Sequence, residues 1–127
     1  MDESAAPLFR QIADLVEDSI LDGTLRPGDR APSTNELSSF HRINPATARK
    51  GLTLLVDAGV LEKRRGIGMF VTEAAHSLIV ERRREAFPAT YLAPLVDEAV
   101  KLEMSRTDLH ELIDRVAESR GLYQEQP

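Results

Sequence analysis

The tetrapeptide Asn44-Pro45-Ala46-Thr47 constrains this 127-residue chain more than any other stretch, because it predicts where one helix must begin. Asn is among the favoured N-caps, and Pro is favoured at the first helical position, where its missing N–H needs no partner. The helical pattern runs to about Ala58, and Gly59 is a typical stop. Its two faces are apolar (Ala48, Leu52, Leu55, Val56) and largely polar (Ala46, Thr47, Arg49, Lys50, Thr53).

The polar face places cationic and hydroxyl groups on the first turns of a helix whose N-terminus already favours anions. That arrangement is typical of a DNA recognition helix. Taken alone, it is equally typical of an amphipathic surface helix with two solvated cations.

The residues before this helix predict a shorter one. Ser33 and Glu36 have the spacing of a capping box, and Leu37 and Phe40 then follow at i, i+3 in a helix from Ser33 to about Phe40. Residues 41–43 make a brief turn into Asn44. The two helices and this turn have the spacing of a helix–turn–helix.

The residues after the recognition helix predict a β-hairpin. Residues 60–63 and 69–71 read as short strands, and the segment between them is Arg64-Arg65-Gly66-Ile67-Gly68. Its glycines permit a tight reversal, and its arginines reach outward. The predicted fold class is therefore mainly α with a small β-hairpin, namely a winged helix–turn–helix.

With these motifs in place, the chain resembles the GntR family of bacterial transcriptional regulators. The resemblance covers roughly the first 72 residues without a gap. It rests on Pro7-Leu8-Phe9, Gln11-Ile12, Gly23 to Leu25, Pro27-Gly28-Asp29, Pro32-Ser33, Glu36-Leu37, Asn44-Pro45, Thr47, Arg49, Gly59 and Gly66 to Val71. Asn-Pro at the start of the recognition helix, with a short C-terminal segment, resembles the YtrA-like subgroup more narrowly.

The chain departs from the family pattern at several positions. Ala31 and His41 stand where members usually carry Leu, and Ser33-Thr34-Asn35 stands where they carry Ser-Glu-Arg. The resemblance implies that Ser33, Asn35 and Asn44 lie at the DNA. Asn35 could make only a shorter, neutral hydrogen bond in place of the family's arginine contact.

The net charge of −5 divides unevenly along the sequence. Residues 1–25 carry −5, residues 26–71 carry +4 and residues 72–127 carry −4. The positive segment coincides with the predicted reading head, so the acidic remainder would repel phosphate and help to orient that head. Such swings are also common in charged proteins.

Helices are predicted on both sides of the reading head. A first helix from Pro7 to Asp22 has an apolar stripe of Leu8, Ile12, Leu15, Val16 and Ile20. After Val71 a polar helical stretch covers residues 73–85, with a break or kink expected near Pro88 and a boundary near Pro94. Ser105 with Asp108 caps a last helix that ends at Arg120-Gly121, before a frayed tail from Leu122.

The C-terminal helices cannot enclose a large core alone. Their apolar stripes comprise Leu92, Leu95, Val96, Ala99 and Val100, then Leu109, Leu112, Ile113 and Val116. The simplest partner for them is a second copy of the chain, as the family resemblance also implies; the alternative is packing on the chain's own N-terminal domain. The predicted domains are a winged helix–turn–helix at 1–72 and a helical dimerisation segment at 73–127.

The expected DNA contacts divide by element. In the helix from Pro45, Arg49 is the candidate for a bidentate contact to guanine, Thr47 with the first-turn amides would bind a phosphate, and Lys50 would meet the backbone. Asn44 is expected to serve mainly as the cap. Arg64, Arg65 and the Gly66 amide would set the wing on the sugar-phosphate edge or in the minor groove. Arg30 either touches a phosphate or points to solvent.

Other classes of function are less well supported. The three histidines lack a metal-ligand spacing, and no nucleophile elbow or phosphate loop occurs, so neither an enzyme nor a cofactor or metal site is expected. Cysteine is absent, and no long apolar run or signal peptide appears, which favours a cytoplasmic protein without a membrane partner.

The predicted function is a sequence-specific transcriptional regulator, more readily a repressor than an activator, that binds a pseudo-palindromic operator as a homodimer. The alternative is a winged helix used only for protein contacts. A small-molecule effector would have to bind between the heads and the helical segment or at the dimer seam, near Phe87 and Tyr91, although such aromatic residues are more often core residues.

Overall fold

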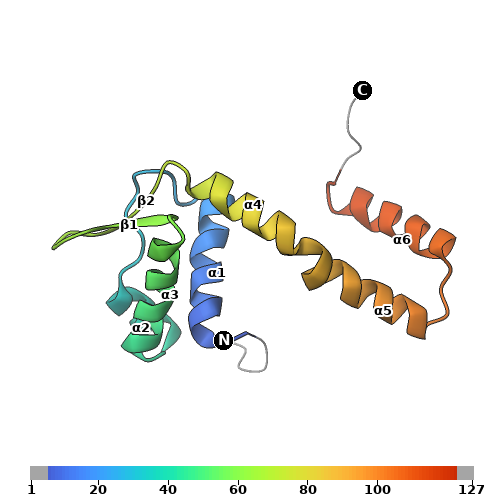
Figure 1. Cartoon of the computed structure of the whole chain (residues 1–127), viewed down its shortest axis with the longest axis horizontal. Helices are drawn as coiled ribbons and strands as arrows, with labels where there is room; N and C mark the ends of the chain where they lie inside the picture. The colour runs from blue at the N-terminus through green and yellow to red at the C-terminus, as the bar shows by residue number, and fades with distance from the viewer. Residues whose placement is uncertain (1–5, 123–127) are drawn as a thin grey trace. The chain divides into compact units, whose positions relative to one another are not determined.

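The computed structural model describes residues 6–122, which form two compact units that divide between Arg84 and Glu85. The first unit contains α1 (Leu8–Leu21), α2 (Thr34–His41), α3 (Pro45–Asp57), β1 (Leu61–Arg64), β2 (Gly68–Val71) and the first part of α4 (Ala75–Phe87) (Figure 1). The second contains the end of α4, a π-helical turn η1 (Pro88–Leu92), α5 (Ala93–Lys101) and α6 (Arg106–Ser119). The predicted fold class, mainly α with a small hairpin, is confirmed.

The caps explain why α2 and α3 begin where they do. Ser33 Oγ accepts a hydrogen bond from the Glu36 amide at 3.1 Å, and Glu36 Oε1 accepts one from the Ser33 amide at 3.1 Å. Asn44 Oδ1 accepts from the Ala46 amide at 2.8 Å, with Pro45 as the first helical residue. Both predicted helix starts are confirmed.

The wing has more backbone pairing than the sequence indicated. β1 and β2 form an antiparallel hairpin in which Leu61 pairs with Val71 and Arg64 pairs with Gly68. The outer edge of β2 is paired as well, because the Ala31 amide donates to the Met69 carbonyl at 2.8 Å and the Val71 amide donates to the Asp29 carbonyl at 2.9 Å. The connection between α1 and α2 is therefore hydrogen-bonded to the wing.

One core lies among the elements of the first unit. Its buried side chains come from α1 (Ile12, Ala13, Val16, Ile20), Ala31, α2 (Leu37), α3 (Ala48, Leu52, Leu55), the hairpin (Val60, Leu61, Val71) and α4 (Ala75, Ile79). The first turns of α4 thus pack with the winged helix. For this reason the compact units separate twelve residues later than the boundary after residue 72 suggested by the sequence.

Helices α1 and α3 pack in close backbone contact at Gly51. A Cβ at this position would lie 2.7 Å from the Phe9 carbonyl oxygen and 2.9 Å from Ile12 Cγ2. Only glycine permits so close an approach of the two helices. This packing holds the recognition helix on α1.

Two apolar residues that follow the helical spacing of α1 and α2 are exposed. Leu15 is 39% exposed and Phe40 is 83% exposed. The apolar stripe of α1 is narrower than its sequence suggests, and the eight-residue α2 buries only Leu37. Spacing alone does not settle which of two apolar residues in so short a helix faces the core.

The second unit contains the proline-rich stretch at which a break was expected. The Ala93 amide donates to the Pro88 carbonyl, which is the i to i+5 bond of a π-turn, and the backbone at Phe87, Leu92 and Ala93 stays in the helical region. The wider turn therefore accommodates Pro88 without ending the helical backbone. A new helix segment nevertheless begins at Ala93, near the expected boundary.

The last helix begins as predicted. Ser105 Oγ accepts from the Asp108 amide at 3.0 Å, and Asp108 Oδ2 accepts from the Ser105 amide at 3.2 Å. α6 ends at Ser119, and Gly121 follows with a φ of 82°. Beyond Leu122 the predicted tail lies outside the described residues. Within residues 6–122, none of the helices combines the length and the apolar character that crossing a bilayer requires.

Candidate nucleic-acid interface

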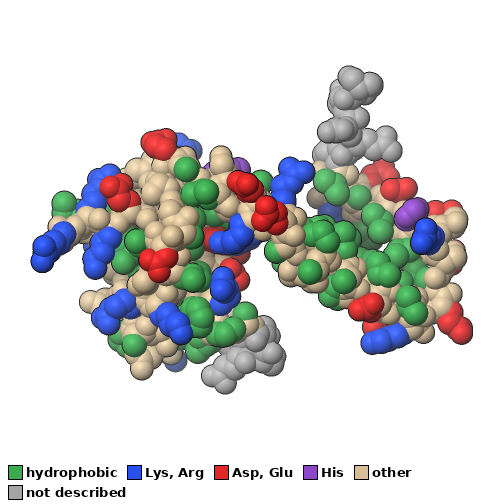
Figure 2. Space-filling view, in the orientation of Figure 1, with side chains coloured by type: hydrophobic (Ala, Val, Ile, Leu, Met, Phe, Trp, Pro, Cys, Tyr) green, Lys and Arg blue, Asp and Glu red, His purple; other side chains and the backbone are tan. Residues whose placement is uncertain are grey.

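A groove on the first unit lies between the N-terminus of α2, the exposed face of α3 and the hairpin; we call it the head groove. It gathers six of the predicted DNA-contact residues, which are Arg30, Ser33, Asn35, Arg49, Arg64 and Gly66. Figure 2 shows Lys and Arg side chains projecting over the hairpin and the neighbouring helices of this unit. Residues from three separate elements thus line one basic surface.

Arg30 is held against the wing. Its backbone forms a bridge with Phe70, and its side chain passes so close to Gly68 that a Cβ there would lie 2.9 Å from Arg30 Nε. Arg30 lines the head groove and is exposed, so its contact with a phosphate stays a prediction. Gly68 supplies the room for its side chain.

The tip of the wing presents two arginines differently. Arg64 stacks over the Phe70 ring, with its guanidinium carbon 4.2 Å from the ring centroid. Arg65 is exposed in the turn next to Gly66, whose φ of +76° suits glycine. Arg64 is therefore oriented by its own strand pair, whereas Arg65 is free to follow a partner.

The recognition helix divides its two cations between different surfaces. Arg49 is exposed and lines the head groove. Lys50 instead places its Nζ 4.1 Å from the centroid of the Phe9 ring on α1, outside the groove. The expectation that Lys50 meets a phosphate now competes with this cation–π contact inside the protein.

The amides at the start of α3 already have partners. The Ala46 amide donates to Asn44 Oδ1, and the Thr47 amide donates to the Asn44 carbonyl at 2.9 Å. Pro45 has no N–H to offer. The Asn44 side chain is thus occupied as a cap, as the sequence indicated. Of the groups predicted to bind a phosphate, the Thr47 hydroxyl is the one whose role these amide contacts do not limit.

Eight residues that line the head groove were not among the predicted contacts, and three of them are Thr34, Lys63 and Ile67. Lys63 begins the continuous basic run Lys63-Arg64-Arg65, and that run was the signal that could have identified it. Ile67 is 62% exposed in the wing turn. Its apolar side chain beside two arginines had no counterpart among the expected contacts.

The C-terminal apolar stripes lie mostly at the surface of the second unit. Ala99 is buried and Leu109 is partly buried. The other seven are exposed to between 38% and 69%, and they are Leu92, Leu95, Val96, Val100, Leu112, Ile113 and Val116. We call these seven the α5/α6 apolar face, and Figure 2 shows hydrophobic side chains gathered over both helices.

The two aromatic residues considered for an effector lie next to each other. The rings of Phe87 and Tyr91 have centroids 5.4 Å apart, and the residues are 49% and 63% exposed. They are therefore not core residues of a single chain. Their exposure extends the apolar surface of the second unit.

Comparison with known proteins follows the same division of the chain. The sequence model of the gntR family of bacterial regulatory proteins matches residues 8–71, which is the winged helix without the later helices. Over 114 residues the chain is 30% identical to the HTH-type transcriptional repressor YtrA of Bacillus subtilis (strain 168), covering 90% of this chain and 87% of YtrA. The similarity to YtrA agrees with the subgroup suggested by the Asn-Pro helix start.

Solved structures resemble both the whole chain and the reading head. A transcriptional regulator of the GntR family from Bacteroides thetaiotaomicron superposes with a TM-score of 0.70 at 26% identity, covering 89% of this chain and 98% of that one. AraR(DBD) in complex with operator ORX1 superposes with a TM-score of 0.52 at 29% identity, covering 57% of this chain and 87% of that one. From the matched winged helix and the nearly full-length similarity, the chain belongs to the gntR family of bacterial regulatory proteins, as a DNA-binding transcriptional regulator with a winged-helix fold.

Proposed function

We propose that this regulator binds a pseudo-palindromic operator as a homodimer and represses transcription by occupying it. The observation that carries the proposal is the head groove, in which Arg49 of α3 lies with Arg64 of the wing and Asn35 of α2. A major-groove helix flanked by a basic wing reads bases with one element and holds the backbone with the other.

Each groove residue has a role that follows from its chemistry. Arg49 is exposed on α3 and carries the planar fork that matches the O6 and N7 of guanine. Arg30, Arg64 and Arg65 bring charge to the backbone on the wing side. Asn35 and Ser33 are short neutral groups at the start of α2, so they add hydrogen bonds rather than charge to the interface.

The homodimer is supported by the α5/α6 apolar face. Val100 is 69% exposed and Val116 is 55% exposed. Seven exposed apolar side chains on one small unit are costly to leave in water. A second copy would bury it and would present two reading heads with half-sites about one helical turn apart, ~10 base pairs.

Repression follows from occupancy, because a bound dimer excludes polymerase without any further contact. YtrA is itself named a transcriptional repressor. Any small-molecule effector would act by changing the affinity of this dimer for DNA, and the exposed Phe87–Tyr91 pair is the place where we would look for it.

The test is selection of binding sites from random duplex DNA with the purified full chain. We expect a recovered motif with two inverted half-sites, and affinity for it that falls steeply as salt rises, because phosphate contacts release counterions. A winged helix used only for protein contacts would recover no motif and would show no salt-sensitive binding to duplex DNA at micromolar protein.

A further inference from the structure

Charged residues occupy positions in α1 and α4 at which apolar residues would be expected. On α4, Ala75 and Ile79 are buried, and Arg82 and Arg83 continue the same face one turn later. On α1, Glu17 lies beside the core residue Val16 and is 1% exposed. The two helices thus contact each other through charged side chains.

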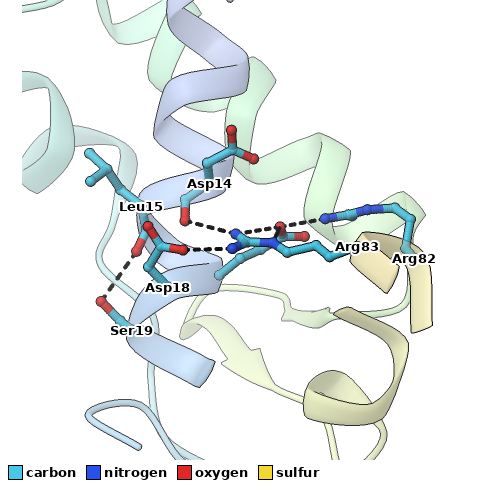
Figure 3. Close-up of polar contacts among 7 residues, drawn as sticks. Asp14, Leu15, Asp18, Ser19, Arg82 and Arg83 are labelled. Atoms are coloured by element: carbon cyan, nitrogen blue, oxygen red, sulfur yellow. Dashed lines mark hydrogen bonds and ion pairs between the residues drawn. The ribbon is translucent and has the colours of Figure 1, made fainter. Parts of the chain in front are cut away.

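The contacts at this point are specific (Figure 3). Glu17 Oε1 accepts hydrogen bonds from Arg82 Nη2 at 2.5 Å and from Arg83 Nη2 at 3.0 Å. Arg83 also donates through Nη1 to Asp18 Oδ1 at 2.8 Å and through Nη2 to the Asp14 carbonyl at 3.4 Å. Glu17 Oε2 is buried and has no hydrogen-bond partner within residues 6–122. We call Glu17, Asp18, Arg82 and Arg83 the α1/α4 cluster.

The α1/α4 cluster is expected to add little net stability to the fold but to fix the position of α4 on α1. A buried ion pair often stabilises a fold no better than apolar residues of the same volume, because desolvation offsets the attraction. The guanidinium fork of Arg83, however, reaches two carboxylates and a carbonyl at once, so it fixes one position of α4 along α1. An apolar contact would tolerate sliding.

The position of α4 matters because of what it connects. Its first turns belong to the core that holds α3, since Leu78 lies against Gly59 at the end of the recognition helix, and a Cβ at Gly59 would be 3.4 Å from Leu78 Cδ1. Its last residues lead directly into the second unit, which carries the α5/α6 apolar face. α4 is therefore the single covalent path from the reading head to the proposed dimer surface.

We propose that the α1/α4 cluster determines the half-site spacing that the dimer accepts. By holding α4 in one register on α1, these positioning residues limit the separations at which both heads reach their half-sites. This inference rests on the homodimer and operator proposed above. Each added base pair moves a half-site ~3.4 Å along the DNA axis and turns it by about a tenth of a turn. A head whose α4 is fixed on α1 would tolerate such a change less well than one whose α4 can slide.

The experiment measures affinity for a series of duplexes in which the selected half-sites are separated in single base-pair steps, and for a duplex with one half-site. The variants are Glu17→Gln, which keeps the volume and removes the charge, and Arg83→Gln. Arg84→Gln is the matched control, because Arg84 is exposed on the same helix and makes no ion pair within the described residues.

We expect both variants to bind the single half-site within about twofold of the parent chain, since neither residue lies in the head groove. Their preference for the best spacing over the next should fall about threefold or more, within the range by which residues between two sites alter coupling. Arg84→Gln should keep the parent profile. An unchanged profile in both cluster variants, or an equal loss in Arg84→Gln, would overturn the inference.

Two further results are informative. If Glu17→Gln unfolds at the assay temperature, as circular dichroism would reveal, Arg82→Gln takes its place, because Arg83 still holds Glu17 in that variant. A parent chain that shows no spacing preference at all would contradict the dimeric operator complex itself. A parent with a sharp preference that the cluster variants retain would contradict only the role of the cluster.

Discussion

The two units of this chain treat their apolar residues in opposite ways. In the first unit the core is closed, and Ile12, Leu52 and Ile79 are each exposed by 1% or less. Among residues 85–122 of the second unit only Ala99 is buried, while Val100 on the same helix is 69% exposed. Each unit contains a helix with a complete capping box, so the difference lies in how far the apolar faces are buried.

Comparing the two units distinguishes the local capping signals that begin a helix from the burial that stabilises it. The capping box at Ser105 and Asp108 is as complete as the one at Ser33 and Glu36. Local signals therefore start a helix equally well in both units. Stability requires burial in addition, which the proposed homodimer would supply to the second unit.

The largest expected effect comes from removing apolar volume in the first unit. Leu55 on α3 is 1% exposed, and we expect Leu55→Ala to lower the free energy of unfolding by ~2–5 kcal/mol, because it leaves a cavity in a closed core. Thermal or urea denaturation of the purified chain measures the change.

Leu112→Ala is the matched variant in the second unit. Leu112 is 38% exposed, so at protein concentrations where the chain is monomeric its truncation should change the unfolding free energy much less than Leu55→Ala does. At high concentration the difference should narrow if a second copy buries Leu112. Equal losses from both variants in the monomer would break the contrast between the units.

A charge on the α5/α6 apolar face should act on assembly rather than on folding. We expect Val100→Asp to shift the chain toward monomer in sedimentation equilibrium and to lower the affinity for the full operator by ~10²-fold, because two linked heads bind far more tightly than one. Lys101→Asp places the same charge on a neighbouring residue outside that face and should leave assembly unchanged.

Base reading and backbone binding can be separated within the first unit. Arg49→Ala should cost ~1–3 kcal/mol of binding free energy at the selected site and relax the preference at one base position. Arg65→Ala should weaken binding to selected and random duplexes alike. It should also make the affinity depend less steeply on salt concentration. Competition titrations at two or more salt concentrations distinguish the outcomes, and undiminished binding by Arg49→Ala would mean that another residue reads the base.

The sequence predicted the features whose causes are local. Ser33, Asn44 and Ser105 cap helices through contacts two or three residues away, and such contacts can be read from spacing. The hairpin turn could also be predicted from the sequence, because glycine is tolerated there at positive φ, as at Gly66. Six of the predicted DNA contacts line the head groove, and their contacts with DNA stay a prediction.

What the sequence could not predict depends on residues far apart in the chain. Glu17 meets Arg83 across 66 positions, and no periodicity links them. Lys50 turns toward Phe9 for the same kind of reason, since the α1–α3 crossing at Gly51 brings that ring within reach. In both cases the tertiary contact decides which of several solvated cations gains a partner.

The smallest expected effect concerns Asp14, next to the α1/α4 cluster. Burial raises the pKa of this carboxyl above its ordinary value of 3.8, and the charge of Glu17 raises it further, against partial relief from Arg83, Arg10 and Arg82. The folded protein therefore disfavours the ionised form. We expect Asp14→Asn to increase the free energy of unfolding at neutral pH by less than about 1 kcal/mol, because solvent screens a carboxyl that is only partly buried.

The effect of Asp14→Asn on the free energy of unfolding should depend on pH. A raised pKa in the fold means that the native state holds the proton more tightly, so the penalty from Asp14 grows as pH rises from 3.8 through the folded pKa and is constant above it. The advantage of Asp14→Asn should accordingly vanish in acid. Asp22 provides the opposite case, because hydrogen bonds from Thr24 lower its pKa. Asp22→Asn should remove stability that the parent has in full above pH 3.8 and loses as the pH falls through the lowered pKa. Denaturation curves for both variants at several pH values should therefore diverge from the parent in opposite directions; if they move together, Asp14 is not governed by burial beside Glu17.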